Sequence, residues 1–229
     1  MSSHAEGYKT TAKSEGAHAE GTAHQTNDNC MGPYADGKGA HAEGASTTAI
    51  GKGTHAEGRS TNSAIKIIPT LSENTNFNDI KAAWDKDKFL LAIKESAHAE
   101  GVNTIAYQYG HAEGGQTIAK GQYSHAEGQK TQANGTNSHA EGKETISSGA
   151  NSHAEGNKTT ASGENAHAEG GLIKLITIKP ESGNTDATQT FYTVASGKNS
   201  HAEGCGTAAT NTGAHAEGGA EAFDSEFND

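Results

Sequence analysis

The sequence predicts an all-β protein, a parallel β-roll (β-solenoid) built from coils of 14 residues. The tetrapeptide His-Ala-Glu-Gly occurs twelve times in the 229 residues, and its histidines are 14 residues apart without exception from His111 to His167. Small residues also recur at fixed positions after the tetrapeptide. A strict short period means that each repeat is one structural unit, which must stack on its neighbours to bury its surface.

Each coil follows the pattern His-Ala-Glu-Gly-x-x-Thr-x-Ala-x-Gly-x-x-Ser, which is almost complete from His125 to Ser138. Its alternation with a period of two predicts one short β-strand in each half of the coil. The glycines supply the backbone freedom for the turns between the strands. Gly and Thr are poor helix formers, so a helical solenoid is excluded. Coils stacked through strand hydrogen bonds, about 4.8 Å apart, would form a rod.

The composition excludes several classes of protein. With 31% hydrophobic residues and 5% aromatic residues, the chain cannot build an ordinary large core, but the strict period argues against disorder. The formal charge of −11 argues against a nucleic-acid partner or an anionic membrane. No apolar run reaches the roughly 18 residues that a membrane span needs. Residues 1–7 enter the repeat at once without a secretory signal, which predicts cytoplasmic assembly or excision from a longer chain.

The His and Glu of each tetrapeptide share one face of the first strand, and the Ala between them lies on the other face. Small residues suit the narrow interior, so we expect His and Glu to point outward and to meet another copy of the chain; burial inside a single roll is the alternative. Three copies around an axis would pair imidazoles with carboxylates, which would raise the imidazole pKa values. The predicted structural ladder contains these residues: His4, Glu6, His18, Glu20, His41, Glu43, His55, Glu57, His98, Glu100, His111, Glu113, His125, Glu127, His139, Glu141, His153, Glu155, His167, Glu169, His201, Glu203, His215 and Glu217.

Catalytic and metal chemistry are weakly indicated. His and Glu two residues apart can reach one divalent ion, but zinc sites contain a few ligands at defined spacing rather than an unbroken ladder. We therefore predict no metal and no cofactor. A 14-residue coil has no wide groove, and no constellation of nucleophile, base and orienting group stands apart from the repeat, so the sequence predicts that the protein is not an enzyme.

The unit Ser-His-Ala-Glu-Gly-x-x-Thr-x-Ala-x-Gly resembles the repeat of YadA-like trimeric adhesin heads, whose usual strand reads Ser-Val-Ala-Ile-Gly. His replaces Val and Glu replaces Ile, while Ala, Gly, Thr and the second Ala match. The His-Ala-Glu-Gly version is similar to repeats of phage and prophage tail fibres. The resemblance covers most of the chain and implies a left-handed roll, a homotrimer and an adhesive or receptor-binding fibre.

The same resemblance bears on location. Neither the membrane-anchor barrel and coiled-coil stalk of an autotransporter nor the self-cleaving chaperone domain of some phage proteins is recognised, so the chain looks like a head or shaft module. We expect it in a virion, as a tail fibre, or at a cell surface, and the missing signal peptide favours the phage particle.

Inserts that break the period define the organisation of the chain. Residues 1–58 are predicted as the first coils with a loop insert near 24–38, and residues 59–97 as a larger insert. Regular coils follow over 98–170, a hairpin insert over 171–197, and the last coils with a C-terminal tail over 198–229.

Large apolar residues concentrate in these inserts. In the second, strands at 64–68 and 89–93 are expected to form a hairpin that carries a short helix over 77–88. In the third, residues 172–178 should pair with 190–194 across a turn at 181–184. The inserts either pack on trimer mates or face a ligand, and the candidate receptor-facing residues are Tyr34, Phe77, Trp84 and Tyr192.

These observations predict a homotrimeric fibre or adhesin module that binds a host-surface glycan or protein through lateral inserts and contacts other fibre or tail proteins. The alternative is a purely structural shaft or assembly protein with no receptor-binding role. No nucleic-acid or membrane partner is expected.

Overall fold

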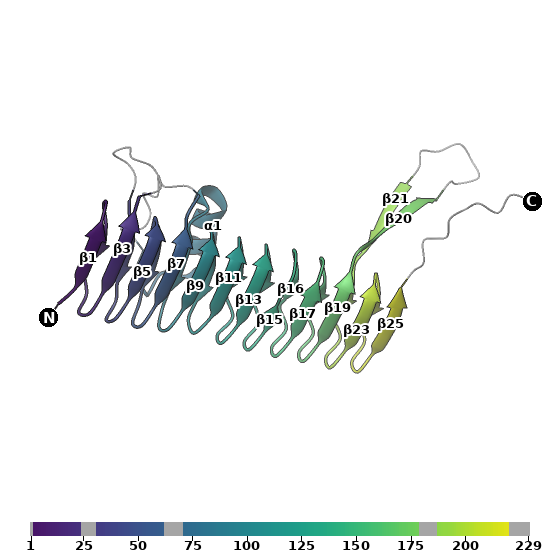
Figure 1. The fold of residues 1–229 in the computed structure, drawn as a ribbon. Coiled ribbons are helices and arrows are strands. Elements are labelled where there is room, and N and C mark those ends of the chain that lie inside the picture. Colours follow the sequence, from purple (N-terminus) through teal and green to yellow (C-terminus); the bar gives the residue numbers. More distant parts are fainter. Residues whose placement is uncertain (1, 24–30, 62–70, 179–186, 220–229) are drawn as a thin grey trace, which may run out of the picture.

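The computed structural model describes residues 2–23, 31–61, 71–178 and 187–219, and it confirms the parallel β-roll. Coils follow one another along a rod, with the two termini at opposite ends (Figure 1). A sheet of twelve parallel strands and a sheet of eleven parallel strands form its two long walls. In the described ranges no helix is long and apolar enough to cross a membrane.

The first sheet contains the His-Ala-Glu-Gly strands, paired so that each histidine lies beside the histidine of the next coil. Its strands are β1 (His4–Gly7), β3 (His18–Thr22), β5 (His41–Ala45), β7 (His55–Arg59), β9 (His98–Val102), β11 (His111–Gly115), β13 (His125–Gln129), β15 (His139–Ala140), β17 (His153–Gly156), β19 (His167–Gly171), β23 (His201–Cys205) and β25 (His215–Gly219). The coil that begins at His98 has 13 residues, yet His98 still pairs with His111. The turn absorbs the missing residue, so the register survives.

The second sheet contains the short strands of the other half of each coil. They are β2 (Thr11–Ala12), β4 (Tyr34–Asp36), β6 (Thr47–Ile50), β8 (Leu90–Ile93), β10 (Ile105–Tyr107), β12 (Ile118–Ala119), β14 (Gln132–Ala133), β16 (Ile146–Ser147), β18 (Thr160–Ala161), β22 (Val194–Ala195) and β24 (Ala208–Ala209). An alanine or serine of each strand pairs with the same position of the next coil, as Ala133 does with Ser147.

The interior of the roll is narrow and filled by small side chains. The alanines of the tetrapeptides, such as Ala112 and Ala126, and the second-strand alanines, such as Ala119, are fully buried. Thr117 and Thr131, at the seventh position of their coils, are also fully buried. Because a single Cβ or a β-branched methyl fills this space, the interior has no room for His or Glu.

Two columns of glycine permit the close stacking of coils. A Cβ on Gly142, at the fourth position, would lie 2.2 Å from the carbonyl oxygen of Gly156 in the next coil, and Gly142 also has a φ of +101°. A Cβ on Gly135, at the eleventh position, would lie 2.0 Å from the carbonyl oxygen of Gly149. The sequence predicted these glycines as flexible turn residues, but the approach of the next backbone is an equal requirement.

The three inserts leave the roll at the same corner, the turn that follows the tetrapeptide strand. They lie between β3 and β4, between β7 and β8, and between β19 and β22. The second insert contains helix α1 (Phe77–Asp87), whose N-cap Asn76 accepts a hydrogen bond from the Asp79 N–H. The third contains the antiparallel pair β20 (Ile173–Ile178) and β21 (Ala187–Phe191), which confirms the predicted hairpin but not its second arm at 190–194, because Val194 already belongs to β22 of the roll. Figure 1 shows α1 and the hairpin on the same side of the rod.

Two further predicted boundaries are wrong. Tyr34 was placed in the first loop, but it begins β4 and pairs with Thr11 and Thr48 of neighbouring coils. Residues 89–93 were predicted as one arm of a hairpin, but β8 pairs in parallel with β6 and β10 of the roll. The other arm, 64–68, and the third insert's turn, 181–184, lie outside the described residues. In both cases the chain returns to the roll earlier than expected.

A glycine of the fourth-position column should be far more sensitive to a methyl group than a glycine one residue further along. We expect Gly142→Ala to destabilise the roll by about 2–4 kcal/mol, because it adds strain at positive φ and a clash with the next coil. Urea unfolding followed by circular dichroism measures the effect. Gly115→Ala is the control, since a Cβ there meets no atom within 4 Å. Equal losses in both variants would contradict the close-approach requirement.

Candidate functional site

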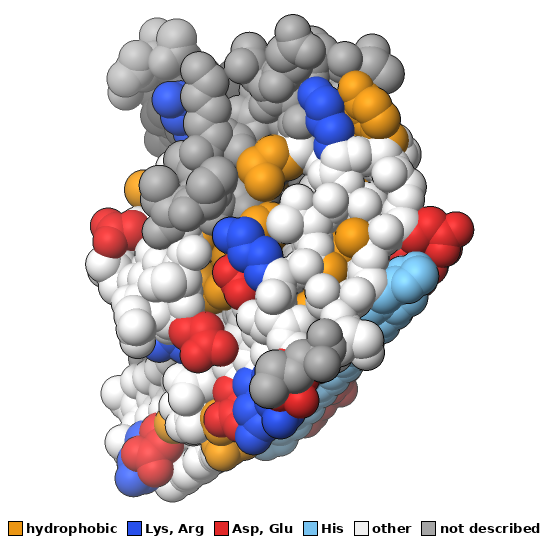
Figure 2. Space-filling model, turned by 90° about the vertical axis from the view of Figure 1, so that its left-hand side faces the viewer, with side chains coloured by type: hydrophobic (Ala, Val, Ile, Leu, Met, Phe, Trp, Pro, Cys, Tyr) orange, Lys and Arg blue, Asp and Glu red, His pale blue; other side chains and the backbone are white. Residues whose placement is uncertain are grey.

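Eleven of the twelve tetrapeptide histidines, from His18 to His215, form one continuous stack on the outer face of the first sheet, and the ring of His4 meets that of His18 edge-on. From His18 to His215 the ring centroids of successive histidines are 4.6–5.0 Å apart, and the rings are parallel to within 12°. Figure 2 shows them as an unbroken stripe along one side of the molecule, beside acidic side chains. The outward orientation agrees with the first sequence interpretation, and the alternative of burial inside a single roll is wrong because alanine fills the interior.

Each glutamate lies next to the histidine of its own strand without a close hydrogen bond in most coils. The distance from Nε2 to the nearest Oε2 is 3.7 Å in the pair His41–Glu43 and 3.9 Å in the pair His98–Glu100. In the first coil, His4 and Glu6 are closer, at 3.4 Å. Further along the rod, imidazoles also approach the carboxylate of the preceding coil, as His167 does at 3.8 Å from Glu155.

Six of the imidazoles are harder to protonate than free histidine, contrary to the sequence-based expectation. The pKa values of six histidines are lowered, first because burial disfavours the cation and then because neighbouring imidazoles repel it; these are His41, His98, His111, His125, His153 and His167. The nearby carboxylates act in the opposite direction but do not prevail. Stacking places each imidazole between two others. A prediction from the His-Glu pair of one coil does not include this repulsion between imidazolium cations.

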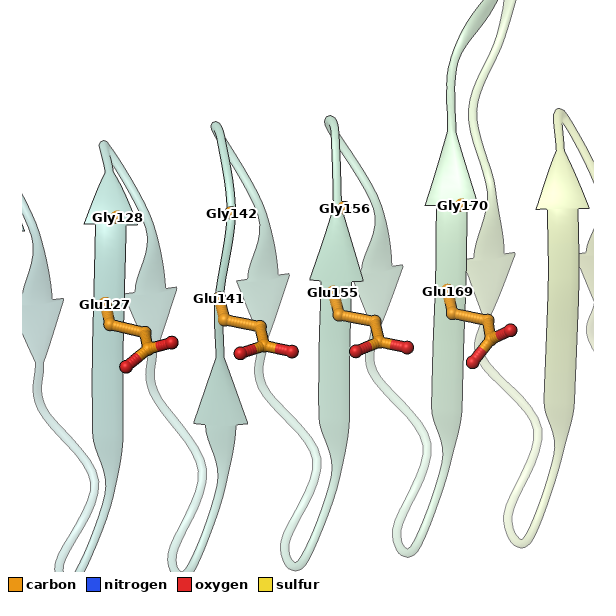
Figure 3. Close-up of a pocket in the computed structure, with 8 residues that line it drawn as sticks. All are labelled: Glu127, Gly128, Glu141, Gly142, Glu155, Gly156, Glu169 and Gly170. Atoms are coloured by element: carbon orange, nitrogen blue, oxygen red, sulfur yellow. The ribbon is translucent and has the colours of Figure 1, made fainter.

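The glutamates form a second column beside the histidines, and a shallow groove follows it. Glu127, Glu141, Glu155 and Glu169 line this groove together with the glycine that follows each of them. Figure 3 shows their carboxylates projecting from successive strands to the same side. Hydrogen bonds with Glu141 and Glu169, burial and their like charge raise the pKa of Glu155 to about 7. Hydrogen bonding with Glu155 lowers the pKa of Glu141, so adjacent carboxyl groups share protons.

The candidate receptor-facing residues do not form one surface. Tyr34 and Trp84 are buried, with 4% and 5% of their surface exposed. Both belong to a satellite core in which Ile80 and Trp84 of α1 pack on the outer face of the second sheet, and Phe77 packs against this core. The Trp84 indole donates a hydrogen bond to the Asn103 carbonyl, 3.0 Å away. The burial of Tyr34 and Trp84 disagrees with a receptor-facing role.

Tyr192, at the base of the hairpin, is the candidate that remains open to solvent, and 47% of its surface is exposed. Phe191 beside it is 39% exposed. Tyr192 borders a hollow on the outer face of the second sheet that is also lined by Glu144, Ile146, Lys158 and Thr160. The sequence analysis did not single out Phe191 or these neighbours, because only the stacked coils place them beside the hairpin.

A third ladder was missed by the sequence analysis. Asn137, Asn151, Asn165 and Asn199 occupy the same turn in four coils, each with a φ of 54–55°. Each of the first three donates an amide hydrogen bond to the next asparagine, at 2.9–3.1 Å. Tyr109 and Tyr123 stack at the same turn in earlier coils. Asparagine tolerates the left-handed conformation better than most residues. Its recurrence two residues before a tetrapeptide histidine therefore could have predicted this turn from the sequence.

The in-register roll, with its outward column of repeated residues and its lateral inserts, is built from repeats of one strand-turn-strand unit. The YadA head domain repeat matches the chain in two copies, over residues 37–60 and 140–166. The chain therefore carries YadA head domain repeats, and the resemblance found in the sequence is confirmed. No curated protein matches the chain with significant similarity.

This similarity supports a module that associates with itself and is exposed at a surface. It also points to an adhesin rather than to an enzyme family.

The lowered imidazole pKa values predict that the roll loses stability in mild acid. A folded-state pKa below the unfolded value of about 6.5 means that the unfolded chain binds protons more readily, so stability is fully present above pH 6.5 and falls as the pH drops below it. Glu155 acts in the opposite direction, but it is one group against six. We expect the thermal midpoint to fall between pH 7.5 and pH 5.

Circular dichroism at each pH measures this midpoint. A chain with His111→Gln, His125→Gln and His153→Gln should show a smaller decrease, because three of the titrating rings are gone. A midpoint that rises on acidification would instead support the raised pKa values first expected from His-Glu pairing.

Proposed function

We propose that the protein is a homotrimeric fibre or adhesin module of a phage tail or bacterial surface appendage, which binds a cell-surface glycan or protein through its lateral inserts. The observation that carries the proposal is the separation of two surfaces on one rigid rod. The His-Glu face is repeated in every coil, whereas all three inserts leave the roll at another corner.

The His-Glu face is suited to contact with other copies of the chain. It is straight, since its strands keep one register over twelve coils. In most coils its histidine side chains are about one-third exposed, for example 35% at His153 and 36% at His125. A solvated face has no need for the same two residues in every coil, whereas a symmetric interface along the rod does. Homotrimer formation by YadA head domains supports three copies.

The lateral corner is suited to a variable ligand, because loops on a rigid scaffold can change without breaking the stack. Tyr192 and Phe191 offer aromatic surface beside the polar groups of Glu144, Lys158 and Thr160. Aromatic faces next to hydrogen-bonding side chains bind sugars and protein loops alike. The hairpin base is therefore the part of the inserts to which we assign receptor contact.

The burial of Tyr34 and Trp84 favours a second candidate function, a structural shaft or assembly protein that joins other fibre or tail proteins. In that case the second insert only covers the apolar outer face of the second sheet. The two functions differ in whether the isolated protein binds cells.

Light scattering at neutral pH should give a mass of about three times 23.5 kDa. Replacing Glu127, Glu141 and Glu155 by lysine should give monomers, because cationic side chains would then replace the carboxylates that pair with the imidazoles of the other chains. Glu15→Lys, Glu95→Lys and Glu164→Lys change the net charge equally at turns and should leave the trimer intact. A monomeric wild-type chain, or a trimer that survives the first set, would contradict the assignment of this face.

Binding of the fluorescently labelled trimer to bacterial cells and to a panel of bacterial surface glycans tests the lateral site. We expect a chain with Phe191→Ala and Tyr192→Ala to bind at least about tenfold more weakly, since exposed aromatic anchors dominate such contacts. Tyr123→Ala removes a tyrosine that is 58% exposed at a regular turn, and it should bind normally. Absence of wild-type binding to every cell and glycan would favour the shaft.

A further inference from the structure

The imidazole Nε2 atoms of the ladder lack partners. In the described part of the chain, ten of them are buried and make no hydrogen bond: those of His18, His41, His55, His98, His111, His125, His139, His153, His167 and His201. Buried polar atoms in folded proteins nearly always have a partner, and an orphan atom calls for an explanation such as a bound ion. Here the same unpaired Nε2 atom recurs in ten coils, so it is a regular feature of the repeat.

In eight strands, the distance between Nε2 and the carboxylate of the same strand corresponds to two ligands of one metal ion. These distances range from 3.4 Å in His4–Glu6 to 3.9 Å in His98–Glu100. Zinc lies about 2.0–2.2 Å from histidine nitrogen and from carboxylate oxygen, so two such ligands at an angle of about 110–135° are about 3.4–3.9 Å apart. The same separations are too long for a good hydrogen bond.

Neighbouring coils supply a further ligand. The Nε2 of His167 lies 3.7 Å from Oε2 of Glu169 and 3.8 Å from Oε1 of Glu155, so one imidazole faces two carboxylates. Glu141, His153 and Glu155 form an equivalent group, with one ligand atom from each within 4.8 Å of the others.

Two histidines do not share an ion in this arrangement. The rings of His153 and His167 are parallel and 4.9 Å apart, so a single ion cannot lie in the plane of both. Since a metal lies in the plane of the imidazole that binds it, each ion takes one imidazole and carboxylates from one or two coils.

An ion can reach this position from solvent. In the single chain, the groove along Glu127 to Glu169 is shallow and open to solvent. The side chains of Glu155 and Glu169 are each 32% exposed, so small rotations admit an ion to Nε2. In the described ranges, the ion pairs recorded for the tetrapeptide glutamates are with imidazoles and none is with Lys or Arg.

Against the sequence-based prediction of no metal, we propose that the His-Glu ladder binds a row of divalent transition-metal ions of the zinc type, each held by one Nε2 and one or two glutamate carboxylates. Mixed imidazole and carboxylate ligands suit Zn²⁺, Co²⁺ and Ni²⁺ better than Mg²⁺ or Ca²⁺, which prefer oxygen alone. Repulsion between dications in adjacent coils favours occupation of about every second coil first. Each site is complete within one chain, so the proposal does not rest on the trimer.

The test is calorimetric titration of the full chain with ZnCl₂ at pH 7.5, after dialysis against EDTA and then against chelator-free buffer. We expect several equivalents of zinc per chain. Replacing Glu127, Glu141, Glu155 and Glu169 by glutamine should remove about two of them, because isosteric amides keep the shape but lose the negative charge. The control replaces Asn137, Asn151, Asn165 and Asn199 by serine in an overlapping set of coils, and it should bind the full number.

Absence of zinc binding by the wild-type chain, or equal stoichiometry in the glutamine and serine chains, would overturn the proposal. Titration of the wild-type chain with Co²⁺ gives a readout that needs no variant, since coordination by nitrogen and oxygen in a four- or five-coordinate site intensifies the visible absorption bands. A spectrum unchanged from aqueous Co²⁺ would also overturn it. Light scattering on the same samples reports the trimer separately, so failure of metal binding and failure of self-association are distinguished.

Discussion

Close in-register stacking of the backbone is the constraint on which the rest of this protein depends. Parallel strands join each coil to the next, and the two glycine columns let the carbonyl groups of one coil approach the backbone of its neighbour. Because register is kept through a 13-residue coil and three inserts, the His and Glu positions of the tetrapeptide become columns of identical side chains about 4.8 Å apart.

This geometry decides the electrostatics of the surface. In-register pairing fixes the neighbours of each side chain in a column, so imidazole stacks on imidazole and carboxylate lies beside carboxylate. Asparagine gains from the arrangement, since one amide donates to the next. Histidine and glutamate do not: stacking lowers the pKa of imidazoles such as that of His125, and the adjacent carboxyl groups of Glu141 and Glu155 share protons. Such a face gains stability from any partner that supplies the missing charges and hydrogen bonds, whether another chain or a cation.

The inserts leave and re-enter the roll at positions that do not disturb the register. All three start where the tetrapeptide strand ends, a corner at which the chain can leave and return without disturbing either sheet. The predicted insert boundaries at Tyr34 and at residues 89–93 were wrong because the spacing from the preceding tetrapeptide does not hold across an insert. Counted back from the next one, Ala35, Ala92 and Ala195 each stand six residues before a histidine, the position of the buried second-strand alanine. The strand that follows each insert can therefore be predicted from its distance to the next tetrapeptide.

The sequence by itself determined the roll, its two strands per coil, the outward His-Glu columns, the short helix and the hairpin, because each of these follows from a local period or a local pattern of turn and apolar residues. Only the tertiary structure decided the burial of Tyr34 and Trp84 in the core between α1 and the second sheet, the lowered imidazole pKa values, the orphan Nε2 atoms and the hollow beside Tyr192. These properties depend on contacts between coils and between an insert and a distant strand. The sequence of a single repeat shows neither kind of contact.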